Sequence, residues 1–279
     1  MQLAVISDIH GNYKALEAVL AYLEDRQVDA VLGLGDYVTD APDPGRILFM
    51  LSRMEKRWHC DWIRGNREQY LIENHYDPKG FRPSSANGML YYVARHIREK
   101  DIRFFESLPI TEKITYPNLP VLRACHGAPK DLRGNVVEEP GLKEKMLKEL
   151  EEPYLLGGHS HHQEKDTLFG KTYINPGSLG LAIDGRGGHA QFAILHGKEA
   201  VWEAELISLP YDLDAYLQEF QDSEIAALGG VLARAVKKTL CTGVNYFYMA
   251  VVEAGKRAGC KTDQVPEEIW EEVASEFDL

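Results

Sequence analysis

Short apolar runs alternate with helical patterns over the first quarter of the chain. Residues 3–7 form a continuous apolar run of the kind found in buried strands, and residues 13–23 then place leucine and valine at helical spacing. Two more apolar runs, residues 30–34 and 60–64, lie on either side of a second helical stretch at residues 47–54. This β-α-β-α-β order predicts a mainly parallel sheet that is covered by helices.

The pattern changes twice in the rest of the chain. Two helices are expected near residues 85–98 and 101–108, and a second sheet is expected from residue 111 onward. After Pro210 the apolar residues return to helical spacing, which predicts a helical extension over residues 212–279. The strands of the second sheet are predicted around residues 114–124 and at residues 154–156, 172–174, 190–195 and 201–206, with a helix at residues 142–150.

The length and composition are those of a globular α/β protein. The chain has 279 residues, of which 44% are hydrophobic, so it can bury a sizeable core. We divide it into a domain over residues 1–207 and a helical extension over residues 208–279. The extension is expected to pack on that domain, where it can narrow a cleft, or to form a homo-oligomer contact.

The charge balance is acidic, with 43 Asp and Glu residues against 31 Lys and Arg residues and a net charge of −12. A field of this sign repels a nucleic-acid backbone and an anionic membrane surface, so neither is an expected partner. The four cysteines form no Cys-x-x-Cys pair, which indicates reduced thiols and a cytoplasmic location. No basic leader and no run of about 18 apolar residues is present, so neither a signal peptide nor a membrane span is predicted.

Metal-ligand side chains follow five of the predicted strands. In an open α/β sheet the carboxyl ends of the strands form the edge where ligands bind, so these side chains are expected to converge. Asp8 and His10 are two positions apart, and on a strand two such residues point the same way. Carboxylate, amide oxygen and imidazole nitrogen suit hard and borderline divalent metals, and seven such donors are enough for two ions. The seven are Asp8, His10, Asp36, Asn66, His126, His159 and His161.

Each of these segments has a structural alternative when it is taken alone. Asp8 can cap a turn beside a structural His10, and Asn66 can cap a helix. A single histidine such as His126 is more often a buried core residue than a ligand. The two imidazoles of residues 159–161 lie beside glycines and form the strongest single pair for chelation. Because all of the alternatives would have to hold together, each at the end of a strand, a shared metal site is the better interpretation.

Taken together, these segments resemble the signature of the calcineurin-like metallophosphoesterases. The resemblance covers residues 1–207 and leaves the C-terminal extension outside it. It implies a four-layer α/β/β/α sandwich, in which two mixed sheets pack face to face, and an enzyme that hydrolyses phosphoric esters. The matching segments are Asp8-Ile9-His10-Gly11-Asn12, Gly35-Asp36, Gly65-Asn66-Arg67-Glu68, His126-Gly127 and Gly158-His159-Ser160-His161, and Asn175-Pro176-Gly177-Ser178 resembles a motif of the bacterial and archaeal small-phosphodiesterase branch.

The resemblance also implies the arrangement of a metal centre. The reagent would be a water that both ions share and that Asp36 helps to hold, and it would attack phosphorus in line with the leaving oxygen. No side chain is assigned as the general acid that would protonate the leaving group. The mixture of imidazole and carboxylate suits Mn²⁺, Fe or Zn²⁺, of which we favour Mn²⁺. If this chain follows the family, one ion would be held by Asp8, His10, Asp36 and His161, and the other by Asp36, Asn66, His126 and His159.

The chain departs from the family at Arg67, where the family carries a histidine after the asparagine. Arginine cannot release its proton at ordinary pH, but it can hold a phosphate with two parallel hydrogen bonds. We expect Arg67 to bind the substrate phosphate, and the alternative is a solvated residue that pairs with Glu68 or Glu73. Asn12 is a second candidate for substrate contact, and the alternative is that it caps the N-terminus of a helix.

The leading functional hypothesis is a dinuclear-metal-dependent phosphoesterase that hydrolyses phosphodiesters or phosphomonoesters of small molecules or nucleotides. A dinucleoside polyphosphate hydrolase is an alternative within the same class. A non-catalytic metal-binding scaffold on the same fold is a second class, which Arg67 favours and the complete ligand set disfavours. A metal-free sugar- or nucleotide-binding module is a third class, and it requires that the protein bind no metal.

Overall fold

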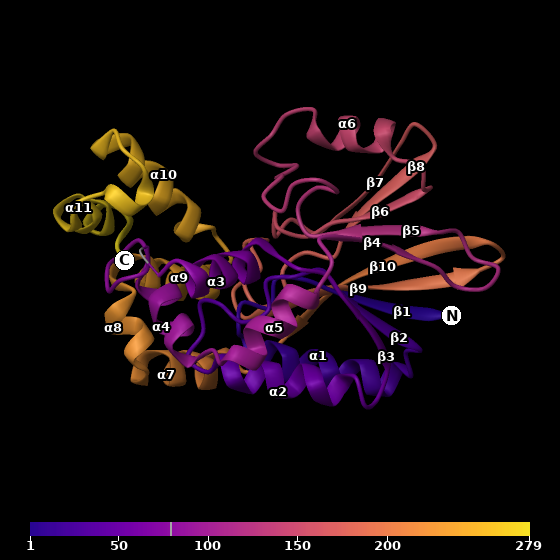
Figure 1. Cartoon of the computed structure of the whole chain (residues 1–279), viewed down its shortest axis with the longest axis horizontal. Helices are drawn as coiled ribbons and strands as arrows, with labels where there is room; N and C mark the ends of the chain where they lie inside the picture. Colours follow the sequence, from indigo (N-terminus) through magenta and orange to yellow (C-terminus); the bar gives the residue numbers. More distant parts are fainter. Residues whose placement is uncertain (79) are drawn as a thin grey trace.

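The computed structural model describes residues 1–78 and 80–279, and it has the four layers that the resemblance implies (Figure 1). Within these residues two five-stranded sheets pack face to face. Helices α1 (Tyr13–Arg26) and α2 (Pro44–Met54) lie on the outer face of the first sheet, and α6 (Leu142–Glu149) lies on the outer face of the second. The α/β/β/α sandwich is therefore confirmed.

The first sheet has the strand order β10-β9-β1-β2-β3 and combines a parallel half with an antiparallel hairpin. Its parallel half consists of β1 (Gln2–Ile6), β2 (Ala30–Gly33) and β3 (His59–Trp62), whose carboxyl ends therefore lie at one edge. The hairpin consists of β9 (His189–Lys198), which runs antiparallel to β1, and β10 (Val201–Pro210), which pairs with β9.

The hairpin corrects one expectation. The sequence pattern assigns residues 190–195 and 201–206 to the second sheet, and this prediction is wrong because β9 pairs with β1, with Leu195 opposite Leu3. Six consecutive residues of β9, from Ala190 to Leu195, are buried. A continuous apolar run shows that a strand is central, but it does not show which sheet the strand joins. That choice depends on a pairing between opposite ends of the chain.

The second sheet has the strand order β4-β5-β6-β8-β7. β5, β6 and β8 are parallel neighbours, so the carboxyl ends of β5 and β6 also share an edge. β7 has the sequence Glu-Lys-Asp-Thr-Leu and was not recognisable from apolar residues, because it is an edge strand with a single partner and mostly polar side chains. The strands are β4 (Thr111–Ile114), β5 (Leu122–Cys125), β6 (Tyr154–Leu156), β7 (Glu164–Leu168) and β8 (Lys171–Asn175).

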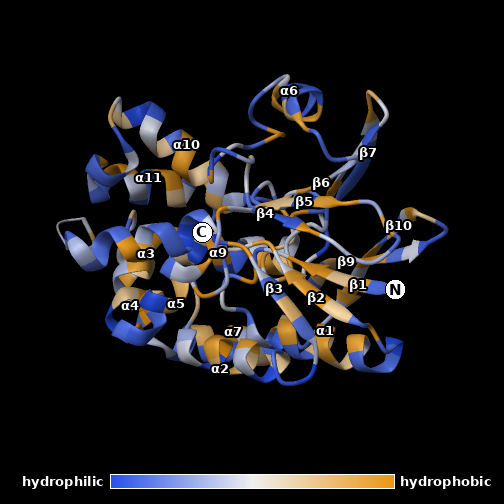
Figure 2. Cartoon of the chain, turned by 45° about the vertical axis from the view of Figure 1, so that its right-hand side comes forward, coloured by the Kyte–Doolittle hydropathy of each residue, from blue (hydrophilic) through white to orange (hydrophobic). Residues whose placement is uncertain are grey.

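Alternate residues of the central strands point to opposite faces of the sheet and belong to different hydrophobic cores. In β1, Ala4 and Ile6 pack with the helices below the sheet, whereas Leu3 and Val5 pack against the second sheet. Leu155 of β6 belongs to a third core under α6. Figure 2 shows the apolar residues of the strands between the layers. The strands are thus fixed on both faces, so the loops at their carboxyl ends start from rigid positions.

The remaining helices lie beside the carboxyl edge of the first sheet (Figure 1). α7 packs on α1, α8 packs on α4, and α10 and α11 pack together on α9, so all of these helices join the core below the first sheet. α10 leaves Tyr248, Met249 and Val252 exposed. The helices are α3 (Asn66–Tyr76), α4 (Gly88–His96), α5 (Glu99–Ser107), α7 (Leu213–Asp222), α8 (Glu224–Leu228), α9 (Gly230–Thr242), α10 (Tyr246–Ala258) and α11 (Glu267–Phe277), with a short 3₁₀ helix at Thr262–Gln264.

Candidate metal centre

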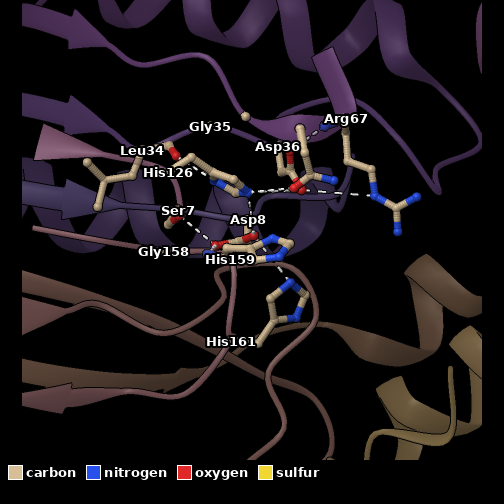
Figure 3. Close-up of polar contacts among 12 residues, drawn as sticks. Ser7, Asp8, Leu34, Gly35, Asp36, Arg67, His126, Gly158, His159 and His161 are labelled. Carbon is tan, nitrogen blue, oxygen red and sulfur yellow. Dashed lines mark hydrogen bonds and ion pairs between the residues drawn. The ribbon is translucent and has the colours of Figure 1, made fainter. Parts of the chain in front are cut away.

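The loops after five strands bring the seven predicted ligands to one place. Figure 3 shows Asp8, Asp36, His126, His159 and His161 among them. Two groups of three side chains each offer ligand atoms that lie within 4.8 Å of one another. Asn66, the seventh residue, joins the second group, because its Oδ1 lies 2.9 Å from Nε2 of His126. The first group is Asp8, His10 and His161, and the second is Asp36, His126 and His159.

Five of the seven residues have a left-handed backbone. Asp8 has a φ of 53° and His10 a φ of 43°, so they lie in a turn beyond β1, and the strand alternation that the sequence suggested does not bring them together. Left-handed conformations are uncommon for residues with a side chain and cost of order 1–3 kcal/mol each. Such backbone strain is concentrated where side chains must converge. The other three ligand residues with a left-handed backbone are Asp36, His159 and His161.

Two glycines let these loops approach closely. A Cβ on Gly65 would lie 2.4 Å from the backbone nitrogen of Asp36 and 2.1 Å from its Oδ1. A Cβ on Gly158 would lie 2.1 Å from Oγ of Ser7. All three distances are shorter than any real Cβ contact, so the Gly-Asn and Gly-His pairs of the sequence reflect crowding around the carboxylates.

Three of the histidines are fixed with Nε2 toward the centre of the cluster. In each of them Nδ1 lies against an oxygen acceptor, which selects the tautomer that carries its proton on Nδ1 and leaves Nε2 free to bind a metal. This is the arrangement that metal-ligating histidines usually have in proteins. The acceptors are Asp40 Oδ2 for His10 at 2.9 Å, the Leu34 carbonyl for His126 at 2.7 Å and the Leu181 carbonyl for His161 at 2.9 Å.

Asp8 carries a buried oxygen that has no hydrogen bond. Its Oδ2 accepts hydrogen bonds from Oγ of Ser7 and from the backbone nitrogen of His159. Its Oδ1 accepts none from the residues that the structure describes, although it is buried. It lies 3.2 Å from Nε2 of His161 and 3.7 Å from Nε2 of His10. An unpaired buried carboxylate oxygen is costly, and a cation at this point would satisfy it.

Asp36 lies between the two groups. Its Oδ2 is 3.4 Å from Nε2 of His126 in one group and 3.9 Å from Nε2 of His10 in the other. Its Oδ1 accepts a hydrogen bond of 2.8 Å from the backbone nitrogen of Arg67. The carboxylate is therefore held from outside by α3 while its free oxygen faces both groups. The donor set and this geometry fit two cations with a shared carboxylate.

The sequence matches the model of the calcineurin-like phosphoesterase superfamily domain over residues 1–200. The chain belongs to the calcineurin-like phosphoesterase superfamily. It is therefore a phosphoester hydrolase, and its two groups of side chains are candidates for the metal on which this superfamily depends. Among the described residues of this phosphoesterase, none of the helices has the length and apolar character needed to cross a membrane.

This phosphoesterase is similar in sequence to one relative and in fold to two solved structures over most of its length. It is 26% identical over 232 residues to an uncharacterized protein of Methanocaldococcus jannaschii, a match that covers 76% of this chain and 88% of that protein. A hypothetical protein from Pyrococcus horikoshii has a similar fold, with a TM-score of 0.73 and 20% identity over 87% of this chain and 98% of the other. A metallophosphoesterase from Sphaerobacter thermophilus has a TM-score of 0.62 and 21% identity over 82% of this chain and 98% of the other.

The charged groups of the phosphoesterase cluster shift each other's pKa values. Burial lowers the pKa of His10, but the hydrogen bond to Asp40 and the negative charges of the neighbouring carboxylates raise it to about 10. Burial likewise lowers the pKa of His126, whereas the charge of Asp36 helps to raise it to about 9. Burial and then repulsion from His126 lower the pKa of His159 to about 4. Positive charge is thus favoured at His10 and His126 and disfavoured at His159, and a bound cation would supply the charge that the carboxylates attract.

Two further carboxylates support the phosphoesterase site and were not found from the sequence. Asp40 holds His10, and nothing in the local pattern marks it, because the two meet only through folding. Glu68 accepts hydrogen bonds from the backbone nitrogens of Asp36, Tyr37 and Gly65 at 2.8, 2.8 and 3.0 Å. Its place at the third position of α3 after Gly65 is a capping-box position, which is a signal that sequence reasoning can use.

The structure places Arg67 at the edge of the cluster (Figure 3). Its side chain is 17% exposed, and its guanidinium lies 3.6 Å from Oδ2 of Asp40 and 4.0 Å from Oδ2 of Asp36. Pairing with Glu68 or Glu73, the alternative left open by the sequence, does not occur. Glu68 binds backbone nitrogens instead, and Glu73 accepts a hydrogen bond from the side chain of a residue on its own helix.

Asn12 caps α1 in the phosphoesterase. Its Oδ1 accepts a hydrogen bond of 3.1 Å from the backbone nitrogen of Ala15. Its Nδ2 donates to the carbonyl of Gly180 at 3.0 Å and to the hydroxyl of Tyr211 at 2.9 Å. The side-chain amide therefore caps α1 through Oδ1 and joins α1 to two later segments through Nδ2. Helix capping accounts for the presence of Asn12. We therefore assign no substrate contact to Asn12.

Proposed function

We propose that this phosphoesterase uses two divalent cations to hydrolyse phosphodiester or phosphomonoester bonds of small molecules or nucleotides. The observation that carries the proposal is the position of Asp36, whose Oδ2 faces both groups of histidines. The unpaired Oδ1 of Asp8 supports it, because this buried oxygen needs a positive partner. One cation would bind Asp8, His10, Asp36 and His161, and the other would bind Asp36, Asn66, His126 and His159.

The bound cations would acidify a water for attack on phosphorus and neutralise charge on the phosphoryl oxygens. The protein orients the ligands beforehand, since three of the imidazoles are fixed through Nδ1 and Asp36 is fixed by the backbone of α3. Little reorganisation is then needed when charge develops in the transition state. The mixed nitrogen and oxygen donors lead us to propose Mn²⁺ as the metal.

Arg67 is the residue that we propose to bind the substrate phosphate. Asp36 and Asp40 hold its guanidinium by charge, at 4.0 and 3.6 Å. Across residues 1–78 and 80–279 no side chain or carbonyl accepts a hydrogen bond from this guanidinium, so its donors remain free for a phosphate. Because arginine cannot protonate a leaving group, we expect aryl esters and phosphoanhydrides to react faster than alkyl esters.

The test uses the full chain stripped of metal and then given Mn²⁺, with a chromogenic aryl phosphodiester and the matching monoester as substrates. We expect turnover that requires Mn²⁺, disappears with chelator and is abolished by Asp36→Asn. Asp25→Asn is the matched control, because Asp25 is exposed on α1 and should leave turnover unchanged. Metal bound without turnover of either ester, or full activity of Asp36→Asn, would contradict the proposal.

A further inference from the structure

A second arginine, Arg133, lies beside α3, the helix that begins with Asn66 and Arg67. Arg133 is exposed in the loop that follows β5, the same loop that begins with the candidate ligand His126. A compact turn shapes this loop, since Ala128 and Asp131 exchange backbone hydrogen bonds of 2.7 and 3.1 Å. The guanidinium carbon of Arg133 lies 4.8 Å from the centre of the Tyr70 ring. No acceptor or carboxylate within the described part of the chain pairs with this guanidinium.

Tyr70 connects Arg133 with Arg67. Arg67 and Tyr70 are three residues apart on α3, so their side chains are neighbours on one face of that helix. Arg67 is itself covered by an aromatic ring, because its guanidinium carbon lies 5.6 Å from the centre of the Phe247 ring. The two arginines therefore share one arrangement, in which an aromatic ring supports the guanidinium and no hydrogen-bond acceptor of the described residues uses its donors.

This arrangement suits anion binding. Stacking on an aromatic ring holds a guanidinium in place while its edge stays available for a pair of hydrogen bonds to phosphate. Local positive charge is needed for this, because the chain carries a net charge of −12 and would otherwise repel phosphates. Arg67 on α3 and Arg133 in the loop after β5, which Tyr70 connects, extend positive charge outward from the proposed metal centre.

We propose that Arg133 binds a second phosphate group of the substrate, outside the one that is hydrolysed. The substrate class would be phosphoesters or phosphoanhydrides that carry at least two phosphate groups. This inference rests on the proposed function, in which Arg67 binds the phosphate that reacts. Arg133 would then determine which phosphoesters bind well, whereas the chemistry itself would stay with the metal centre.

The test measures binding, so that it does not depend on turnover. Calorimetry on the full chain, loaded with Mn²⁺ at a fixed free concentration, would give dissociation constants for inorganic phosphate and pyrophosphate. We expect pyrophosphate to bind at least tenfold more tightly than phosphate, and Arg133→Ala to remove that preference, a loss of about 1.4 kcal/mol. Arg133→Lys should keep part of it, because an ammonium supplies the charge but not the planar pair of donors.

The matched control is Arg57→Ala. Arg57 is also exposed, and its guanidinium carbon lies 5.9 Å from the Trp58 ring, but it precedes β3 and so lies at the opposite edge of the sheet. This variant should keep the preference for pyrophosphate. The inference is overturned if the wild-type chain shows no preference, or if Arg133→Ala keeps it or weakens both ligands equally. Hydrolysis of aryl esters, measured separately, decides the proposed function by itself.

Discussion

Nδ1 of His10 lies 2.9 Å from Oδ2 of Asp40, and both side chains are buried. The carboxylate fixes the ring so that Nε2 faces Oδ1 of Asp8, at 3.7 Å. Asp40 also lies 3.6 Å from the guanidinium of Arg67. One buried carboxylate thus orients a candidate metal ligand and holds the proposed phosphate-binding residue.

Replacement of Asp40 should weaken metal binding although Asp40 is not a ligand. Loss of a carboxylate behind a ligating histidine typically costs roughly 10–100-fold in metal affinity. We expect Asp40→Ala to show a loss in that range in a Mn²⁺ titration followed by calorimetry. Asp25→Ala should leave the affinity unchanged, because Asp25 is exposed on α1. A Mn²⁺ affinity of Asp40→Ala within twofold of the wild type would show that Asp40 does not orient His10.

Arg67 should contribute to catalysis through its planar pair of donors. Arg67→Ala is expected to lower kcat/KM on an aryl phosphoester at least tenfold, about 1.4 kcal/mol. Arg67→Lys should recover only part of this, since a single ammonium cannot reproduce two parallel hydrogen bonds. Steady-state kinetics with saturating Mn²⁺ checks both variants. If Arg67→Ala has the kinetics of the wild type, Arg67 does not bind the reacting phosphate.

The C-terminal helices reach the site through Phe247 on α10, whose ring lies 5.6 Å from the guanidinium carbon of Arg67. A cation–π contact of this kind is worth about 0.5–1 kcal/mol. We therefore expect Phe247→Ala to raise KM about two- to fivefold with little change in kcat. Phe49→Ala is the control, because Phe49 is 63% exposed on α2. A KM equal to that of the wild type would mean that α10 does not affect Arg67.

Glu152 gives a prediction for stability and pH. It is 5% exposed, accepts a hydrogen bond of 2.6 Å from Arg123 and lies 2.8 Å from Nζ of Lys113. Burial raises the pKa of Glu152, but its hydrogen bonds to Lys113 and Arg123 lower it from 4.5 to about 2. Because the folded pKa is the lower one, this stabilisation is complete above pH 4.5 and is lost as the pH falls toward 2.

We therefore expect Glu152→Gln to lower the free energy of unfolding by about 1–3 kcal/mol at pH 7, because the amide oxygen can still accept from Lys113 and Arg123 but no longer carries a negative charge. The difference from the wild type should shrink at pH 3. Urea unfolding at both pH values measures it. Glu151→Gln is the control, since Glu151 is 88% exposed and its partner lies 3.6 Å away. An equal deficit at pH 3 and pH 7 would contradict the charge-based explanation.

The carboxyl-edge position of the ligand residues could be predicted from the sequence because it follows from local patterns, whereas the four layers were implied by the family resemblance. The apolar runs of β1, β2 and β5 are visible in the chain, and so is a candidate ligand within three residues of the end of each strand. What the sequence cannot predict is set by contacts between distant segments. The pairing of β9 with β1 is one case, and the meeting of Asp40 with His10 is another.

The backbone conformation of the ligand residues could not be predicted from the sequence pattern either. Strand alternation is the simplest reason for Asp8 and His10 to share a face, but both residues have a left-handed backbone in a turn. That conformation is favourable only because surrounding loops fix it, including the close approach of Gly65 to Asp36. The residue types at the site therefore indicate its chemistry, while the tertiary structure determines how the side chains point.

The central claim is that Asp36 is shared by two cations. A crystal structure of the Mn²⁺-loaded chain, with anomalous scattering recorded at the manganese edge, tests it most directly. The account predicts two anomalous peaks, one beside Asp8, His10 and His161 and one beside Asn66, His126 and His159, with Asp36 in contact with both. A single peak, or two peaks of which one does not touch Asp36, would contradict it.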